Sequence, residues 1–415
     1  MRKSPARETA GAWIRRVYWP ARLPSLRNHA VMTALDRQAP TQGPPYFAID
    51  GGTMKSLRVA CIALGSMGWL AVAGSAVAQA PAVVMSGLDN PRGLAFAPNG
   101  ALYVTEAGRG GAGPCVVNPN TGETRCYGKS GAITRLWKGQ QSRVAEGLES
   151  HAMPDGSSAS GPNDISFQGT GGAYITMGLG GNPDFREALG GEFFGTLIHM
   201  AASGKWKVVA DVLEHEIEEN PAGGLVDSNP FGVLAEPGGR LVADAGANAL
   251  LRVAANGKVE TVAVFPPLQN PTGFGPPLIE SVPTAVARGP DGALYVGQLT
   301  GFPFVQGLAN IYRLLPGQAP ELYCAGGFKA IMDLAFGPDG SLYVVENATN
   351  AFPPPPPFAP NSGRLSRVGP GCTSVEPLLE GLDRPTAVAV DADGAIYVTN
   401  HGVTAGMGEV LKIAP

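Results

Sequence analysis

The sequence predicts an all-β fold, a six-bladed β-propeller built from four-stranded antiparallel blades. Three observations predict it: a two-strand unit that repeats along the chain, two further strands after each copy, and a spare strand before the first copy. Self-similarity at a fixed period is the signature of repeat architectures, in which each unit needs its neighbours to bury its apolar face. We therefore take the repeat as the unit of the fold.

In each copy a Pro or Ile is followed nine positions later by a turn glycine and a short β-rich run. The clearest copies read NPRGLAFAPNGALYVTEAG, VPTAVARGPDGALYVGQLTG and RPTAVAVDADGAIYVTNHG. Alternating apolar residues on both sides of a glycine turn are typical of a β-hairpin. The six intervals are Pro91 to Gly100, Pro162 to Gly171, Pro230 to Gly239, Pro283 to Gly292, Ile331 to Gly340 and Pro385 to Gly394.

Two further strands follow each hairpin. After GALYVTEAG come AITRLWKG and SRVAEGL, and after GALYVGQLTG come NIYRLLPGQ and PELYCAGG. Four-stranded antiparallel sheets repeated around an axis are the blades of a propeller. The last copy has only three strands, and residues 82–88 (AVVMSGL) precede blade one as SRVAEGL precedes blade two. We expect this N-terminal strand to complete blade six and remove an unpaired edge, which an open solenoid would leave.

The N-terminal region is expected to lie outside the propeller, which we assign to residues 81–415. Residues 54–80 read as a signal peptide, with Lys55 and Arg58 before an apolar run and a small-residue cleavage signal at 76–78. A single transmembrane anchor is the alternative, although the apolar run is short and diluted with Gly and Ser. Residues 1–53 lack periodicity and are interpreted as a mis-annotated or disordered extension. The predicted location is periplasmic or secreted, with no membrane span after cleavage.

Removal of the leader changes the charge of the protein. The whole chain has a formal net charge of −4, whereas residues 79–415 alone have −11, because residues 1–78 hold ten Lys and Arg but only three Asp and Glu. An acidic surface does not attract nucleic acid or anionic membrane. The composition is compatible with cations or neutral small molecules as ligands, and we expect a monomer.

Four cysteines follow the predicted cleavage point. In an oxidising compartment an even number indicates disulfides, with three possible connectivities. Cys115 and Cys126 lie in one loop, and Cys324 and Cys372 are 48 residues apart, which is the local repeat length. These pairs are the preferred bridges. A zinc site is the weaker alternative, since no CxxC or CxH spacing occurs.

The connections between strands are unequal in length. Turns between first and second strands, and between third and fourth strands, are short, and in an up-and-down blade both sets lie on one face, called here the bottom face. The long segments fall on the opposite, top face, where binding residues usually gather. The segment FPPPPPFAP at 352–360 is expected to be a polyproline II stretch on that face. The long segments are 107–131, 149–162, 179–195, 213–230, 265–283 and 347–362.

Two sets of residues lie at the top of the predicted blades. The residues that end the second strands, called here the capping ring, are Glu106, Met177, Asp244, Gln298, Glu346 and Asn400. The residues beside the starts of the first strands are called here the mouth ring. They are Arg92, Asn163, Phe231, Thr284 and Met332, each one position past the first residue of its blade, and Arg384, one position before Pro385. Gln298, Asn400 and the top-loop residue His401 are the candidate ligand-binding residues.

The next position is Gly or Ala in four blades, but Asp164 and Asp333 in blades two and five, which are opposite each other in a ring of six. Carboxylates across a channel mouth suit Ca²⁺, with Glu106, Asn163, Asn229, Asp244 and Glu346 as further oxygen donors. The alternative is that these side chains cap strand ends, as Asp and Asn commonly do. Calcium is therefore a candidate cofactor, with both interpretations open.

The repeat pattern PxG(L/V)AxxPDGxLYVT resembles NHL-type propellers, and more closely the ScyD/ScyE family of exported six-bladed propellers. The segments that carry this resemblance include GLDNPRGLAFAPNGALYVTEAG, GPNDISFQGTGGAYITMGLGG and GLDRPTAVAVDADGAIYVTNHG, and it spans about residues 82–415. The resemblance implies the fold and export, and little chemistry. A protein that binds a small molecule or a partner protein or peptide on its top face is therefore the first functional prediction.

Two enzyme groups give an alternative. Six-bladed lactonases of the gluconolactonase and paraoxonase type use Ca²⁺ held by Glu, Asn and Asp to polarise an ester carbonyl, and the oxygen-rich mouth here is similar. A calcium-dependent lactonase or esterase is therefore the second prediction. Quinoprotein sugar dehydrogenases share a run like that of blade one, but their active-site His has no counterpart in the matching stretch SGPNDISF. The sequence does not decide whether the protein is an enzyme.

Overall fold

The structure is a computed structural model that describes residues 80–170, 172–350 and 358–414. They belong to one compact unit, Ser75–Pro415. The predicted extension at 1–53 and the signal peptide at 54–80, except its last residue, lie outside the described residues, as does most of the proline tract. No helix among the described residues is both long and apolar enough to cross a membrane.

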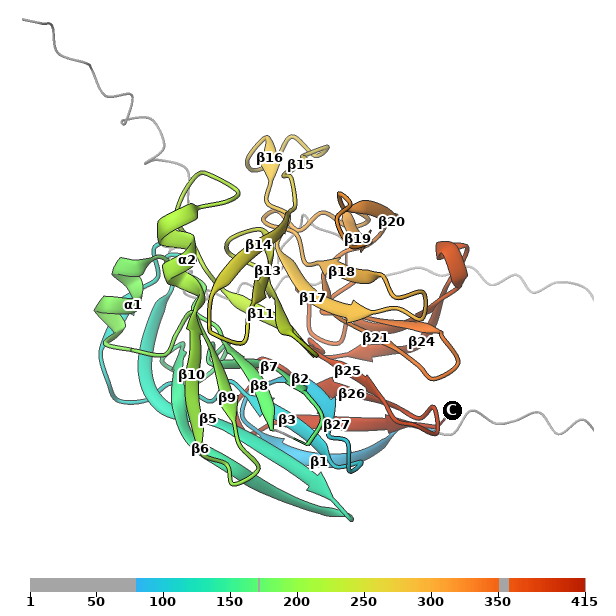
Figure 1. The fold of residues 1–415 in the computed structure, drawn as a ribbon, viewed down its shortest axis with the longest axis horizontal. Coiled ribbons are helices and arrows are strands. Elements are labelled where there is room, and N and C mark those ends of the chain that lie inside the picture. Colours follow the sequence, from blue (N-terminus) through green and yellow to red (C-terminus); the bar gives the residue numbers. More distant parts are fainter. Residues whose placement is uncertain (1–79, 171, 351–357, 415) are drawn as a thin grey trace, which may run out of the picture. The chain divides into compact units, whose positions relative to one another are not determined.

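The described residues form six antiparallel blades arranged in a ring, which confirms the predicted six-bladed β-propeller (Figure 1). Blade one contains β2 (Pro91–Phe96), β3 (Leu102–Glu106), β5 (Thr124–Trp137) and β6 (Gln140–Ala152). Blade two contains β7 (Pro162–Phe167), β8 (Ala173–Met177), β9 (Thr196–Met200) and β10 (Trp206–Asp211). Blade three contains β11 (Pro230–Glu236), β12 (Gly239–Asp244), β13 (Ala249–Val253) and β14 (Val259–Val264).

The last three blades repeat this order. Blade four contains β17 (Pro283–Arg288), β18 (Leu294–Gln298), β19 (Ala309–Leu314) and β20 (Glu321–Phe328). Blade five contains β21 (Ile331–Phe336), β22 (Leu342–Glu346), β23 (Gly363–Val368) and β24 (Val375–Leu382). Blade six contains β25 (Val388–Val390), β26 (Ile396–Asn400), β27 (Gly408–Ile413) and β1 (Ala82–Leu88).

Strand β1 closes the ring as predicted. It pairs antiparallel with β27, with Ala82 opposite Lys412 and Leu88 opposite Gly408, and the blue and red strands lie side by side in Figure 1. The N-terminal strand is thus the fourth strand of blade six, and blade six becomes the neighbour of blade one. Closure covers the outer edge of β27, which would otherwise be unpaired.

The strand registers place the two faces as predicted. In blade one Pro91 pairs with Glu106 at one end and Phe96 with Leu102 at the other, next to the short turn. Ala132 pairs with Glu106, so the long segment between β3 and β5 is at the Glu106 end. The turn between β5 and β6 joins Trp137 and Gln140 at the opposite end. The starts of the first strands and the ends of the second strands therefore share the top face.

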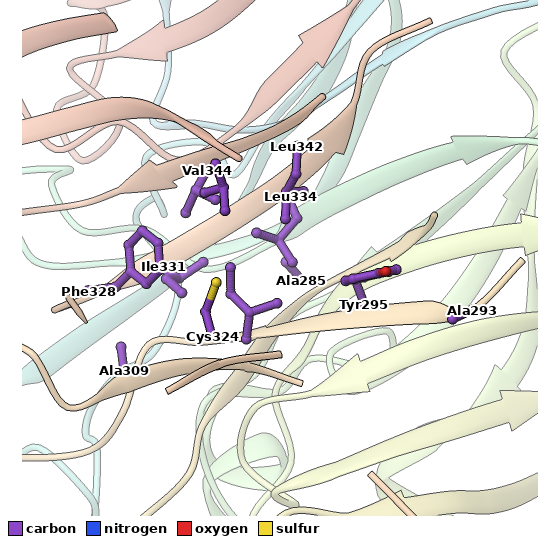
Figure 2. Packing of buried hydrophobic residues seen from close by; sticks show 12 residues of the cluster. Ala285, Ala293, Tyr295, Ala309, Cys324, Phe328, Ile331, Leu334, Leu342 and Val344 are labelled. Carbon is purple, nitrogen blue, oxygen red and sulfur yellow. The ribbon is translucent and has the colours of Figure 1, made fainter. Parts of the chain in front are cut away.

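The hydrophobic core is divided among the interfaces between blades. The cluster drawn in Figure 2 takes Ala285 and Tyr295 from blade four and Leu334, Leu342 and Val344 from blade five. Other clusters join blades one and two, two and three, three and four, five and six, and six and one. The apolar alternation of the repeat thus buries each blade against the next, which fixes the spacing of the strand ends around the axis.

Several elements inside the long segments were not predicted. Helix α1 (Pro183–Leu189) begins at Asn182, whose side chain accepts a hydrogen bond from Phe185 N, and α2 (Val212–Glu219) begins at Asp211 in the same way. Leu189 and Leu213 of these helices pack in one apolar cluster. The remaining additions are β4 (Cys115–Val117) against β5, and a hairpin of β15 (Leu268–Gln269) and β16 (Leu278–Ile279).

Both predicted disulfides are present. Cys115 bonds to Cys126 where β4 pairs with β5, and Cys324 on β20 bonds to Cys372 after β23. The first bridge fastens the long top segment of blade one. The second bridge joins blades four and five, as the match between cysteine spacing and repeat length predicts.

Candidate functional site

The capping ring is built into the connections between blades. In four blades the side chain that ends the second strand accepts a hydrogen bond from a backbone N–H in the turn just before its own blade. The donors are Asp89 N to Glu106 at 2.7 Å, Asn229 N to Asp244 at 2.6 Å, Lys329 N to Glu346 at 3.0 Å and Asp383 N to Asn400 at 2.8 Å. The common geometry follows from the repeat, because the turn always returns beside the end of the second strand. These side chains satisfy buried backbone donors.

The two glutamates of this ring also pair with arginines of the same blade. Arg143 donates to both carboxylate oxygens of Glu106, at 3.1 and 2.8 Å, and the Nε of Arg364 donates to Glu346 at 2.8 Å. Both glutamates are 1% exposed. Burial raises the pKa of Glu346, although Arg364 and the Lys329 N–H favour its charged form. Each carboxylate therefore has a full set of donors.

The other members of the capping ring are equally enclosed. Ser228 donates to Asp244 at 2.6 Å, and burial raises the pKa of this aspartate. Gln298 is fully buried, and it bonds Ser281 and accepts from Asn310 Nδ2 at 3.0 Å. Met177 packs in the core between blades one and two. Of the predicted ligand-binding residues, Gln298 thus has no exposed surface in the structure, and Asn400 is half-buried.

His401 lies beside a charged pair at the start of blade six. Its Nδ1 is 3.1 Å from Asp383 Oδ2, and Arg384 Nε donates to Asp383 Oδ1 at 3.0 Å. Burial raises the pKa of Asp383, but the bonds from Arg384 and His401 outweigh burial and hold that pKa below its usual value. His401 is half-buried and adjoins Gly402, whose carbonyl accepts a hydrogen bond from Arg92.

Asp164 and Asp333 occupy equivalent positions on opposite blades, as predicted. Each accepts one hydrogen bond from the next residue and one from the following blade: Val233 N to Asp164 at 2.7 Å and Val388 N to Asp333 at 2.9 Å. Burial raises the pKa of Asp164 to about 7. Burial and, secondly, the charge of Asp164 raise the pKa of Asp333, so the two carboxylates act on each other.

Asp164 also explains the small residue at this position in blade one. A Cβ on Gly93 would lie 2.5 Å from Asp164 Oδ1, which is too close for any side chain. Two carboxylates fit around the axis because the neighbouring first strands carry Gly or Ala. The aspartate side chains therefore occupy space that the small residues of neighbouring blades leave free, and each accepts a hydrogen bond from the following blade.

The predicted calcium ligands do not form one site in the structure. Glu106, Asp244 and Glu346 lie in three different blades, and each is occupied by N–H donors, a hydroxyl or an arginine. Throughout residues 80–170, 172–350 and 358–414, no group of three or more His, Cys, Asp or Glu side chains could hold a metal ion. This donor set does not fit the six to eight oxygen ligands of Ca²⁺. Calcium binding therefore stays a prediction from sequence.

Five of the six mouth-ring residues converge on one cavity of about 390 Å³, called here the channel-mouth pocket. Its lining residues are Arg92, Ser158, Ala159, Ser160, Asn163, Asn229, Phe231, Leu299, Met332, Asn347, Phe358, Arg384 and Val403. Blades one, two, three, five and six contribute mouth-ring side chains. Thr284 of blade four instead donates to Ile331 O at 2.7 Å. A cavity of this size is within the range of small-molecule sites.

The polar part of the pocket consists of two serines, two arginines and three asparagines. Arg92 is 8% exposed, and it donates to Gly402 O at 3.1 Å and to Ala159 O at 2.6 Å. No acidic side chain of the described residues forms an ion pair with it. Burial, with a smaller contribution from Arg125, lowers the pKa of Arg92 to about 10, which leaves it charged at neutral pH.

The side-chain amides of the three asparagines are oriented by contacts within the protein. Asn163 Nδ2 donates to Pro230 O at 3.0 Å, and Asn347 Nδ2 donates to Pro385 O at 3.1 Å. Each bond joins one blade to the first residue of the next blade. Asn229 Oδ1 lies 3.5 Å from Asn163 Nδ2. The amide groups are therefore held in place before any ligand arrives.

The apolar part of the pocket comes from Phe231, Leu299, Met332, Phe358 and Val403. Phe358 follows the proline tract and packs against Phe304, with ring centroids 4.6 Å apart. The Nζ of Lys329 lies 5.5 Å from the Phe358 ring. The pocket thus combines fixed polar groups with an aromatic and aliphatic wall.

A second hollow of about 490 Å³ lies beside blade one and is lined by Arg109, Lys129, Arg143 and Glu146 among others. Arg109 and Arg143 both pair with the buried carboxylate of Asp89, at 2.7 and 3.0 Å. Its cations are therefore already neutralised in part, and it contains no equivalent positions from other blades. The channel-mouth pocket is the better candidate site.

Sequence reasoning identified the mouth ring but did not select its arginines as site residues. A signal was present: Arg92 and Arg384 lie directly beside the first prolines of blades one and six, and ring closure makes these blades neighbours. The loop residues Ser158, Asn347 and Val403 had no such signal, because no repeat position predicts where a long loop folds.

Comparisons with known proteins show similarity in structure only. No family model matches the chain, and no curated protein matches it. Among solved structures, the calcium-binding protein regucalcin from Agrobacterium tumefaciens is 14% identical, with a TM-score of 0.48 over 81% of this chain and 93% of its own. The PQQ-bound aldose sugar dehydrogenase from Streptomyces coelicolor is 15% identical, with a TM-score of 0.48 over 80% of this chain and 96% of its own. Virginiamycin B lyase from Staphylococcus aureus is 14% identical, with a TM-score of 0.42 over 79% and 96%. Similarity at this level carries no information about ligand or reaction.

Proposed function

We propose that this protein is an exported, ScyD/ScyE-like β-propeller that binds a small molecule in the channel-mouth pocket. The observation that carries the proposal is the convergence of five mouth-ring residues, four of them at equivalent positions, on one cavity at the long-loop face. Binding sites commonly lie in loops gathered over one end of a rigid scaffold. The pocket is concave, and it has few polar groups against an apolar wall, as small-molecule sites do.

The mouth ring differs from a structural ring in its spare bonding capacity. Arg92 can donate five N–H groups, and the protein accepts two hydrogen bonds from it. The pocket asparagines Asn163 and Asn347 use their Nδ2 donors within the protein, and no protein donor bonds their Oδ1 atoms in the described residues. A ligand at this place would meet donors and acceptors already oriented, which lowers the entropic cost of binding.

Export is supported by the two disulfides, which persist in oxidising compartments, together with the signal sequence predicted at 54–80. Expression of the whole chain in a Gram-negative host tests this point. We expect the periplasmic fraction to contain a protein whose N-terminus lies close to residue 79. An uncleaved cytoplasmic product with reduced cysteines would contradict the proposed export.

Ligand-observed NMR with a mixture of anionic, cationic and neutral aromatic fragments tests the pocket. Val403→Trp places a large ring in the cavity, and Val262→Trp on the exposed face of β14 is the matched control. We expect fragments that bind the wild-type protein and the control but not Val403→Trp. Fragments that bind all three proteins equally, or none, would contradict a site at the channel mouth.

The calcium-dependent lactonase or esterase is the alternative from sequence. No arrangement of donors in the described residues favours it over ligand binding, since the carboxylates of the capping ring already have partners. The effect of Ca²⁺ is tested separately below.

A further inference from the structure

We propose that the ligand of the channel-mouth pocket is an organic carboxylate with an aromatic or aliphatic body, held by Arg92 as its principal counter-ion. The inference rests on the proposed binding function and names the ligand class for that site. Its basis is a buried guanidinium that has no acidic partner among the residues the structure describes, beside a second arginine and an apolar wall.

A buried cation without a counter-ion is unfavourable, and proteins rarely keep one without a use for it. Within the described part of the chain, the hydrogen-bond partners of Arg92 are two carbonyls on different loops, Gly402 O and Ala159 O. The charged side chain that acts on it is another cation, Arg125, and this lowers the pKa of Arg92 further below its usual value than burial alone. Arg125 itself is paired with Glu123. An incoming anion would therefore supply the charge that the protein omits.

The two carbonyl bonds also orient the guanidinium. One terminal nitrogen donates to Gly402 O and the other to Ala159 O, so each keeps one N–H, and Nε keeps its own. A planar guanidinium that keeps an N–H on each of its three nitrogens has enough donors for the two oxygens of a carboxylate. The fork is fixed before binding, so little side-chain entropy is lost.

The balance of charges among the pocket residues favours a ligand with a single negative charge. Arg384 lines the same pocket, but Asp383 already accepts from its Nε at 3.0 Å. Arg92 is thus the one pocket cation without an acidic partner among the described residues, and Arg384 can offer its terminal nitrogens as neutralised donors. A monoanionic carboxylate balances this site, whereas a dianion would leave an excess negative charge.

The wall of the pocket selects the rest of the ligand. Phe231, Met332, Leu299 and Phe358 present apolar surface opposite the polar groups. Burial of aromatic or aliphatic surface against these residues would add affinity in proportion to the area covered. The acidic surface of the protein, with a net charge of −11 over residues 79–415, disfavours anions in general, so the positive pocket adds selectivity.

Three probes with one ring system test the proposal by calorimetry: indole-3-acetate, the neutral indole-3-acetamide and the cationic tryptamine. We expect the acetate to bind the wild-type protein about tenfold or more tightly than the acetamide, as charge-assisted hydrogen bonds predict. Arg92→Met should lower the affinity for the acetate to that for the acetamide and leave the acetamide unchanged. Arg252→Met, outside the pocket on β13, is the matched control and should behave as wild type.

The outcomes separate this inference from the proposed function. Binding of the acetamide or tryptamine as tightly as the acetate, with loss in Val403→Trp, would overturn the carboxylate assignment and keep the pocket. No binding by any probe at millimolar concentration would overturn the assignment as well. If Arg92→Met fails to fold, Arg384→Met provides the second variant, and we expect it to weaken the acetate about threefold to tenfold and the acetamide hardly at all.

Discussion

The capping ring and the mouth ring lie at the same end of the propeller and have similar polar composition, but only one of them is available to a ligand. In the capping ring Glu106, Asp244 and Glu346 are buried and every carboxylate is occupied by protein donors. In the mouth ring Arg92 is equally buried, yet it faces a cavity and lacks an acidic partner within the described part of the chain. The difference teaches that bonding partners, and not residue type, distinguish a site from a structural cap.

The largest expected effect is on stability, from the capping ring. Glu106→Ala removes the acceptor of Asp89 N and the partner of Arg143. Breaking a buried pair from one side costs about 3–5 kcal/mol, and we expect the lower end because Arg143 can rehydrate. Urea denaturation measures the change. The matched variant of the mouth ring, Arg384→Ala, should cost less than about 1 kcal/mol, because its pair with Asp383 is partly exposed. Equal losses from the two variants would remove the distinction between the rings.

The second prediction separates stability from ligand binding. Replacement of Cys324 and Cys372 together by Ala should lower the free energy of unfolding by about 2–4 kcal/mol. Replacement of Cys115 and Cys126 should lower it by about 1 kcal/mol less, because their bridge closes a loop of 11 residues and the other bridge a loop of 48. Neither pair lines the channel-mouth pocket. We expect the affinity for indole-3-acetate to stay within about twofold of wild type in the folded Cys324 and Cys372 variant. A loss of affinity as large as that of Arg92→Met would mean that the pocket depends on the outer strands.

The fold was predictable because it rests on repeated, local chemistry. The strands of the six blades lie where alternation and turn glycines indicate, and the strand at 82–88 pairs as predicted. The site was less predictable, because its chemistry lies in deviations from the repeat. Asp164 and Asp333 were recognised as deviations, and their mutual influence agrees with opposite blades. The partners of Glu106 were not predictable, since Arg143 is 37 residues away and nothing in the repeat marks it.

The pH dependence of stability tests whether the buried carboxylate of Asp164 has a raised pKa. Burial raises the pKa of Asp164 to about 7, and its unfolded value is near 3.9, so the folded state binds the proton more tightly. The contribution of Asp164 to the free energy of unfolding is therefore fully present below about pH 4, and it is lost as the pH rises to about 7. Asp164→Asn removes this titration. We expect the stability of the variant relative to wild type to rise by about 1–2 kcal/mol from pH 4 to pH 8. This is less than the full pKa shift would give, because Asp164 is half-buried and solvent screens part of the effect.

Urea denaturation of both proteins at pH 4, 6 and 8 measures this difference, and Asn163→Ala serves as a control that changes a neighbouring amide without changing a titratable group. Its stability relative to wild type should be independent of pH. Parallel pH profiles for wild type and Asp164→Asn would mean that the carboxylate keeps its usual pKa, as it would if water or a bound cation filled the axis.

The smallest expected effect concerns calcium, and it decides between the two interpretations of the oxygen-rich mouth. If the carboxylates act as caps, addition of 5 mM Ca²⁺ or EGTA should shift Tm by less than about 1 °C, because a ligand that binds the native state weakly stabilises it little. A rise of several degrees that is lost in Asp164→Asn would instead place a cation between Asp164 and Asp333, where two carboxylates influence each other. A rise that persists in Asp164→Asn and disappears in Glu106→Gln would place the cation in the capping ring. That result would mean that Arg143 and the Asp89 N–H can release a carboxylate that they hold at hydrogen-bonding distance, and the comparison between the two rings would fail.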